Sequence, residues 1–132
     1  MKPADKQSYV LDASALLAYL QREPGYNRVS EALARGAAAS AVNLSEVYAK
    51  VTHWALPLDE VADRLAALGL ETVDFTEEDA RAAGNLYPSV KSLGLSLADR
   101  ACLALGVRLG VPVMTTDRAW KRVNGIQVEL LR

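Results

Sequence analysis

The stretch "YVLDASALLAYL", residues 9–20, places one carboxylate inside an otherwise apolar run. Its first part, up to Asp12, has the composition of a short buried strand, and the small residues and leucines that follow favour a helix. Burying a carboxylate costs free energy unless it is paired, hydrogen-bonded or bound to a cation. Because no basic residue lies near Asp12 in the sequence, a distant part of the chain must supply its partner.

The composition indicates one folded domain. A chain of 132 residues can bury a single core, since domains usually contain about 100–150 residues. Hydrophobic residues make up 51% and charged residues 23%, which excludes a disordered or fibrous protein. The formal net charge is −1, so any binding of nucleic acid must depend on a local basic patch rather than on the overall charge.

Cysteine usage and the N-terminus favour the cytoplasm. Cys102 is the only cysteine, which excludes an internal disulfide framework and a thiolate metal cluster. Residues 1–7, "MKPADKQ", form a polar lead-in without the apolar core of a signal peptide. No segment has the ~20 uninterrupted apolar residues of a membrane span. We therefore expect a cytoplasmic protein, without a membrane partner, in which residues 1–132 form one domain.

Strand-like and helix-like segments alternate along the chain. Five short apolar or alternating segments are typical of strands: 8–12, 36–42, 70–75, 111–116 and 126–130. Longer stretches between them carry apolar residues at helical spacing, as in Leu97, Ala101, Leu105 and Leu109. This alternation predicts an α/β fold, a three-layer α/β/α sandwich around a mostly parallel sheet of about five strands. The second segment, "GAAASAV", could equally continue a helix.

The glycines indicate where helices end. Gly69, Gly110 and Gly125 each fall between a helical pattern and a strand, where a residue with positive φ often ends a helix. No glycine-rich phosphate-binding motif occurs in the sequence. The glycines therefore indicate element boundaries and not a nucleotide site.

Four acidic residues are predicted at one edge of this sheet. Asp12 and Asp117 each follow a predicted strand, and Glu46 and Asp99 fall in the first turns of predicted helices. Ligands of open parallel sheets bind outside the carboxyl ends of the strands. Four carboxylates gathered there would repel one another and raise one another's pKa values unless a cation lay among them. Oxygen ligands without histidine or cysteine indicate Mg²⁺ or Mn²⁺ rather than zinc.

Each acid also has a purely structural interpretation. Asp12 could cap the helix that begins near Ser14. An N-cap followed by an acid at N3 fits three stretches, of which the last has no other reason to be a site: Asn43–Glu46, Ser96–Asp99 and Thr76–Asp79. Surface pairs at i,i+4, each contributing roughly 0.2–0.5 kcal/mol, are also available: Glu46 with Lys50, and Asp117 with Lys121.

The acids and their surroundings resemble those of PIN-domain nucleases, in particular the compact VapC toxins of toxin–antitoxin pairs. The matching stretches are "VLDASALLAYL", "NLSEVYAKV", "LSLADRACLAL" and "VPVMTTDRAWKRV", so the resemblance runs from about Tyr9 to the C-terminus. The family carries acids at positions that match Asp12, Glu46, Asp99 and Asp117. It also carries a hydroxyl or amide near the first and last acids, matched here by Ser14 and by Thr115 or Thr116.

This resemblance implies a metal-dependent endoribonuclease with the four acids as catalytic residues and metal ligands. Its substrate would be RNA, with transfer RNA as one candidate, and its partners a second copy in a homodimer and a small VapB-like antitoxin that covers the acidic site. Without a poised nucleophile or histidine base, a water activated by Mg²⁺ or Mn²⁺ would attack the phosphodiester. Four nearby basic residues could hold the RNA strand or could simply be solvated: Arg100, Arg118, Lys121 and Arg122.

The remaining candidates have structural interpretations. His53 lies about two turns from Glu46, which is far for a role at the site, so we expect a structural or surface residue. We expect Trp120 to pack the last helix onto the sheet rather than to stack on a base. Leu16, Tyr19 and Tyr48 continue apolar stripes and are expected in the core or on a dimer face.

Two other functions fit parts of the pattern. An acid after an apolar strand also suits aspartyl-phosphate chemistry, as in haloacid-dehalogenase-like phosphatases or receiver domains. Those phosphatases have a second aspartate two positions later, where this chain has Ser14, and receivers have a lysine after a late strand, where this chain has Asp117. A PIN-like domain that only binds its partner is the non-enzymatic alternative, and the intact set of four acids argues against it.

Overall fold

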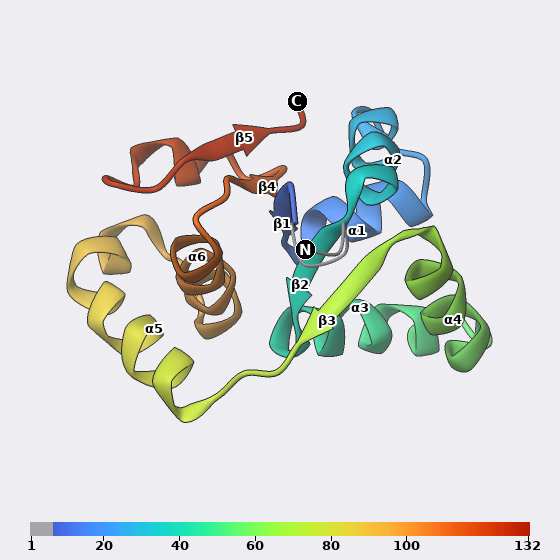
Figure 1. Cartoon of the computed structure of the whole chain (residues 1–132), viewed down its shortest axis with the longest axis horizontal. Coiled ribbons are helices and arrows are strands. Elements are labelled where there is room, and N and C mark those ends of the chain that lie inside the picture. The colour runs from blue at the N-terminus through green and yellow to red at the C-terminus, as the bar shows by residue number, and fades with distance from the viewer. Residues whose placement is uncertain (1–6) are drawn as a thin grey trace.

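The computed structural model describes residues 7–132, so most of the predicted polar lead-in lies outside the described residues. Its five strands are β1 (Tyr9–Leu11), β2 (Ala37–Ser40), β3 (Leu70–Val73), β4 (Val113–Thr115) and β5 (Val128–Leu130). They form one sheet in the order β3-β2-β1-β4-β5, and every pair of neighbours is parallel (Figure 1). None of the described helices is long and apolar enough to cross a membrane.

Helices cover both faces of this sheet (Figure 1). The α-helices are α1 (Ala13–Leu20), α2 (Tyr26–Arg35), α3 (Ala41–His53), α4 (Leu58–Leu68), α5 (Glu77–Val90) and α6 (Leu97–Leu109). Two short 3₁₀-helices follow α5 and β4: η2 (Lys91–Leu93) and η3 (Arg118–Arg122). Helices α1–α4 lie on one face of the sheet, and α5, α6 and η3 lie on the other.

The strand residues divide the core into two parts. Leu11 and Met114 pack with the helices of the first face, whereas their neighbours Val10 and Val113 pack with those of the second. This alternation is what a pleated strand dictates when both faces are buried. The predicted three-layer α/β/α sandwich with a parallel sheet is therefore confirmed.

Strand β2 resolves the ambiguity of the "GAAASAV" segment. Its four residues are all buried, and they pair with β1 on one side and with β3 on the other. Small side chains on a central strand let the helices of both faces approach the sheet closely. The helical alternative for Ala37–Ser40 is therefore wrong, because position in the sheet overrides the weak strand propensity of alanine.

Gly69 shows why glycine is needed at the end of α4. Its φ of 119° lies in the left-handed region, and an added Cβ would overlap the Leu33 carbonyl oxygen. Gly110 ends α6 in the same conformation, as predicted. Gly125, in contrast, lies in the turn between η3 and β5 and follows no α-helix.

The other structural predictions can be compared directly. Trp120 is fully buried in the core of the second face, although the helix that carries it is a 3₁₀-helix. Leu16 is buried, and Tyr19 and Tyr48 pack half-buried against the same core. His53 is exposed at the last position of α3, as expected for a surface residue.

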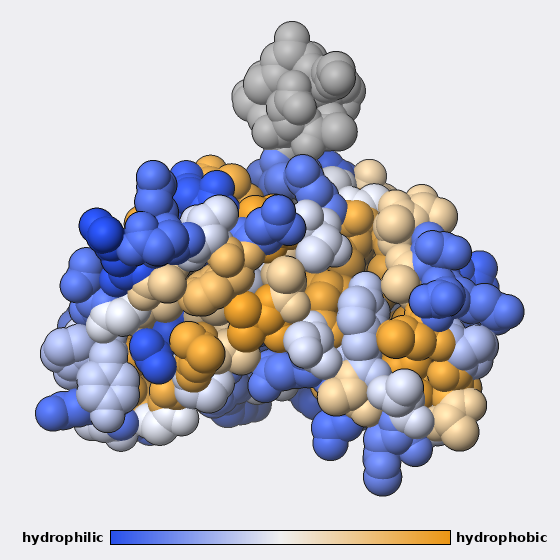
Figure 2. Space-filling view, turned by 90° about the horizontal axis from the view of Figure 1, so that it is seen from below, coloured by the Kyte–Doolittle hydropathy of each residue, from blue (hydrophilic) through white to orange (hydrophobic). Residues whose placement is uncertain are grey.

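The face of the molecule on the side of β3 combines apolar and charged side chains. Seen from the side of β3 and α5, apolar side chains gather in the middle of the face between hydrophilic flanks (Figure 2). The edge strand β3 exposes Glu71 and Thr72. A charged side chain on a short edge strand opposes pairing with another chain.

Candidate functional site

The four predicted acids line one pocket at the carboxyl edge of the sheet. Asp12 follows β1, Asp117 follows β4, and helices α3 and α6 contribute Glu46 and Asp99. The pocket has a volume of about 260 Å³. Its lining residues are Asp12, Ala13, Ser14, Leu17, Glu46, Lys50, Asp99 and Asp117.

Asp12 is the buried member of the set. Only 4% of the residue is exposed, and it is the N-cap of α1. Its Oδ1 accepts hydrogen bonds from Ser14 Oγ at 2.7 Å and from the Ala15 amide at 2.8 Å. Its Oδ2 accepts a bond from Thr115 Oγ1 at 2.6 Å. Asp12 therefore caps α1, as the structural interpretation predicts. The same hydrogen bonds orient its carboxylate, which also borders the pocket.

Hydroxyl groups connect the first acid to the last. Thr115 Oγ1 donates to Asp12 and accepts a hydrogen bond from the Asp117 amide at 3.0 Å. The Thr116 amide donates to Ser14 Oγ at 3.0 Å. Of the three predicted supporting residues, Ser14 and Thr115 thus act through their hydroxyls, and Thr116 makes its contact through the backbone.

Asp99 and Asp117 also combine capping with exposure to the pocket. Asp99 Oδ2 accepts from the Ser96 amide at 2.9 Å, and Ser96 Oγ accepts from the Asp99 amide, which completes the predicted capping box. Asp117 caps η3, with Oδ1 accepting from the Ala119 amide at 3.0 Å. Within residues 7–132, the second oxygen of each carboxylate has no hydrogen-bond donor. That oxygen can serve a ligand.

Glu46 requires a correction to the predicted helix start. The N-cap of α3 is Ser40, whose extended backbone ends β2, and not Asn43. Asn43 is buried inside α3, and its Nδ2 donates to the Ala98 carbonyl at 3.1 Å, which ties α3 to α6. Glu46 consequently lies in the second turn of α3 rather than the first.

Burial and a neighbouring charge raise the pKa values of two acids of the pocket. The pKa of Asp12 is raised to about 6, mainly by burial and to a smaller extent by the Asp99 charge, against the opposing effect of the hydrogen bonds from Thr115, Ser14 and Ala15. Burial and the Asp99 charge also raise the pKa of Glu46. Cys102 lies behind the site, where burial, with smaller contributions from Asp12 and Asp99, raises the pKa of its thiol. The thiol stays protonated and inert.

The donor set fits a hard divalent cation. The side chains lining the pocket that could donate an electron pair to a metal are carboxylates and one hydroxyl, which suits Mg²⁺ or Mn²⁺. Within the described residues, no three acidic, histidine or cysteine side chains converge closely enough to hold one ion among them. A magnesium ion would therefore contact one or two of these carboxylates and keep several waters, which is its usual mode of binding.

None of the four basic residues predicted to hold RNA lines the pocket. Arg100 is directed at α5, where Nη1 donates to the Ala83 carbonyl at 3.1 Å and the guanidinium lies 5.3 Å from the centre of the Tyr87 ring. Lys121 Nζ donates to the Val128 carbonyl at 3.0 Å and makes no ion pair with Asp117. Arg118 and Arg122 are exposed on η3.

Lys50 is a basic residue of the pocket that is not among the four residues predicted to hold RNA. It lines the pocket, whereas none of the four predicted cations does. Its spacing of four residues from Glu46 was a usable signal, since such residues share one face of a helix.

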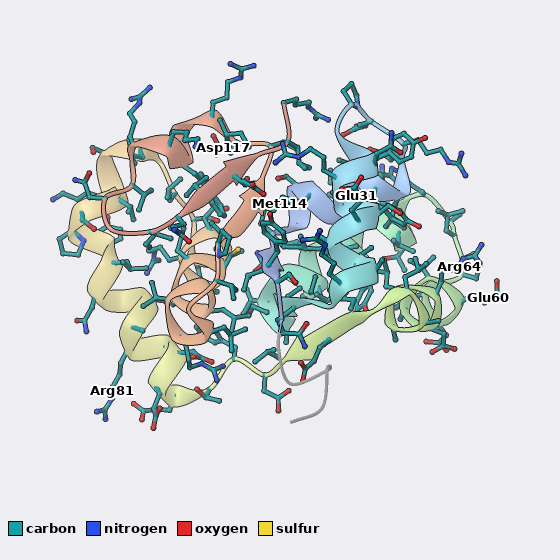
Figure 3. All side chains as sticks on the ribbon, turned by 45° about the horizontal axis from the view of Figure 1, so that its top comes forward. Glu31, Glu60, Arg64, Arg81, Met114 and Asp117 are labelled. Atoms are coloured by element: carbon teal, nitrogen blue, oxygen red, sulfur yellow. The ribbon has the colours of Figure 1, made fainter. Side chains whose placement is uncertain are left out.

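Figure 3 places Asp117 at the start of η3, far from Glu60 and Arg64 on α4.

Comparisons with known proteins identify the family of the chain. The PIN domain model matches residues 9–126. A chain of VapBC-5, from the VapBC family of toxin–antitoxin systems of Mycobacterium tuberculosis, is 25% identical over 96% of this chain and 98% of its own, with a TM-score of 0.59. No curated protein sequence matches the chain.

Two DNA-bound toxin–antitoxin complexes share the fold. A chain of VapBC from Salmonella typhimurium is 17% identical, covers 95% of this chain and 98% of its own, and has a TM-score of 0.75. The corresponding values for VapBC2 from Rickettsia felis, bound to a promoter fragment, are 20%, 92%, 97% and 0.69. Since the family model spans most of the sequence, the chain belongs to the PIN domain family.

Proposed function

We propose that this protein is a metal-dependent endoribonuclease of the VapC type, the toxin of a toxin–antitoxin pair. One observation carries the proposal: four carboxylates from four separate elements border a single pocket. Membership of the PIN domain family and the likeness to chains of VapBC complexes support it. The substrate is RNA, with transfer RNA as one candidate, and the bond cleaved is a phosphodiester.

The chain's own residues hold the acids ready for a cation. Thr115 and Ser14 fix Asp12 so that its carboxylate keeps one orientation. Asp99 and Asp117 each present a free oxygen from a capped helix end. Glu46 is exposed and lines the pocket, and its raised pKa suits a carboxylate that accepts a proton from attacking water. Bound Mg²⁺ or Mn²⁺ would lower the pKa of that water and shield the phosphate charge.

Aspartyl-phosphate chemistry is poorly supported by the same geometry. Haloacid-dehalogenase-like phosphatases have a second aspartate two residues after the nucleophile, where this chain has Ser14. Ser14 donates a hydrogen bond to Asp12 Oδ1 and supplies no second carboxylate. A non-catalytic binding domain is the outcome expected if the purified protein fails to cleave RNA.

The proposed partners are a VapB-like antitoxin and a second copy of the chain. The structures that resemble this one include a toxin–antitoxin complex from Klebsiella pneumoniae. A guanidinium group from such an antitoxin could fork onto paired carboxylates of the pocket and take the place of the cation's charge. Asp99 and Asp117 each have an oxygen that could accept this contact.

Cleavage of a mixed RNA pool tests the proposal. The unaltered protein should cut the pool with Mg²⁺ or Mn²⁺, and a chelator should abolish the cutting. Asp12→Asn should be inactive, while Glu31→Gln, which removes an exposed acid on α2 outside the pocket, should cut like the unaltered protein. Equal cutting by all three proteins would indicate a contaminating nuclease and would leave the proposal without support.

A further inference from the structure

Lys50 occupies a distinct position in the four-acid pocket. It lies four residues after Glu46 on the same face of α3, about 6 Å further along the helix axis. Among the eight described residues that line the pocket, it carries the only basic side chain. Its side chain therefore borders the same pocket as the four carboxylates that would repel a bound anion.

The simplest structural role for Lys50 is an ion pair with Glu46, and the structure does not contain it. The ion pairs within residues 7–132 are Arg28–Glu129, Arg81–Glu77, Arg108–Asp79 and Arg132–Glu23. None involves Lys50 or an acid of the pocket. The side chain is also exposed, so no burial or packing accounts for its place.

Two of the other nearby cations are already engaged. Arg100 is held between the Ala83 carbonyl and the Tyr87 ring, and the ammonium group of Lys121 contacts the Val128 carbonyl. Lys50 has no such contact within the described residues and can move to meet a ligand. Lysine binds a phosphate as a flexible point charge, without the fixed geometry that arginine requires.

We propose that Lys50 binds a phosphate oxygen of the RNA strand in this pocket. The proposal rests on the proposed ribonuclease function and adds the residue that offsets repulsion between the substrate and the acids. Because Lys50 lies one helical turn from Glu46, the phosphate it binds neighbours the one at the acids. Lys50 is a positioning residue, and its loss should weaken RNA binding without changing the chemical step.

The test compares Lys50→Gln, Lys50→Arg and a matched control, Arg64→Gln, which removes one exposed positive charge on α4 (Figure 3). Cleavage of a labelled single-stranded RNA pool is measured with Mg²⁺ over a range of salt concentrations. Lys50→Gln should raise KM about 2- to 5-fold with kcat unchanged, which corresponds to one exposed charge contact. Its plot of log(kcat/KM) against log salt should be shallower by about 0.7, since one phosphate contact is lost.

The outcomes separate this inference from the proposed function. Retention of activity by Lys50→Arg, together with an unchanged Arg64→Gln, supports the inference. A fall in kcat at unchanged KM, or an equal loss in Arg64→Gln, overturns it. RNA binding is also measured by fluorescence anisotropy: binding without cleavage by the unaltered protein contradicts the nuclease function alone, whereas absence of binding contradicts both.

Discussion

Thr115 Oγ1 donates a 2.6 Å hydrogen bond to Asp12 Oδ2 across 103 positions of sequence. The parallel register of β1 and β4 pairs Leu11 with Met114, so the next residue of each strand emerges at the same edge of the sheet. Thr115 also accepts from the Asp117 amide. A single buried hydroxyl thus fixes the relative positions of the first and last acids of the pocket.

Replacing Thr115 by valine removes that hydroxyl and nearly preserves the volume of the side chain. The Asp12 carboxylate and the Asp117 amide each lose a partner, so we expect a loss of about 1–3 kcal/mol in the free energy of unfolding. Thr115→Ser keeps the hydroxyl and should lose less. Urea unfolding measures both, and equal stability of the two variants would show that the hydrogen bonds contribute little.

The raised pKa of Asp12 predicts a pH-dependent stability in the presence of a chelator. The value is about 6 in the folded protein against 3.8 for the ordinary group, so the folded state binds the proton more tightly than the unfolded state. Stability from this group is complete below pH 3.8 and is lost as the pH rises towards 6. The loss is about 3 kcal/mol at most, from the difference of roughly two pKa units.

Thermal melts between pH 4 and pH 7 detect this loss against a background from other groups. Asp12→Asn has no titrating group at the position, so its stability should fall less over the same range. Added Mg²⁺ should reduce the loss in the unaltered protein and have no such effect on the variant. Parallel pH profiles of the two proteins would show that Asp12 does not titrate in this range.

Asp99 and Asp79 form matched capping boxes in different surroundings. Asp99 raises the pKa values of Asp12 and Glu46, while Asp79 makes a two-pronged ion pair with Arg108. Asp99→Asn keeps an oxygen for the Ser96 amide and removes a repulsive charge, so the melting temperature should stay the same or rise while Mn²⁺ binding weakens. Asp79→Asn should melt at a lower temperature and bind Mn²⁺ normally. Titration calorimetry and thermal melts measure these effects, and destabilisation by Asp99→Asn would indicate that capping is its main role.

Much of the pocket can be predicted from the sequence because Asp12 and Asp117 follow apolar strands and Asp99 follows a serine that caps a helix. Asp12, Asp99 and Asp117 each combine a local capping pattern with a place at the carboxyl edge of a parallel sheet. Both the cap and the position at the sheet edge can be recognised in the local sequence, from an apolar strand before the acid or from a serine three residues before it. The sheet then brings these positions together without further information.

Other features depend on contacts that no local pattern contains. The stretch Asn43–Glu46 has the spacing of a cap and an N3 acid, yet the helix begins earlier because β2 ends at Ser40. The side chain of Asn43 is directed at α6, and only the packing of the two helices shows this. The direction of Arg100 likewise depends on where α5 lies, so its closeness in sequence to Asp99 is misleading.

Asn43 offers a test of how the helices position the acids. Its Nδ2 joins α3, which carries Glu46, to the Ala98 carbonyl beside Asp99, and the residue is 1% exposed. Asn43→Ala removes this link and leaves a small cavity, so we expect a loss of about 1–3 kcal/mol in unfolding free energy. Mn²⁺ affinity should fall as well, because Glu46 and Asp99 are no longer held at a fixed separation.

The matched control is Asn85→Ala, on the exposed side of α5. This change should alter stability by less than about 0.5 kcal/mol and leave Mn²⁺ affinity unchanged. Denaturant unfolding and metal titration are run on both variants. If Asn43→Ala loses stability but keeps full metal affinity, the hydrogen bond supports the core alone. The separation of Glu46 and Asp99 would then be set by the packing of α3 and α6 and not by this amide.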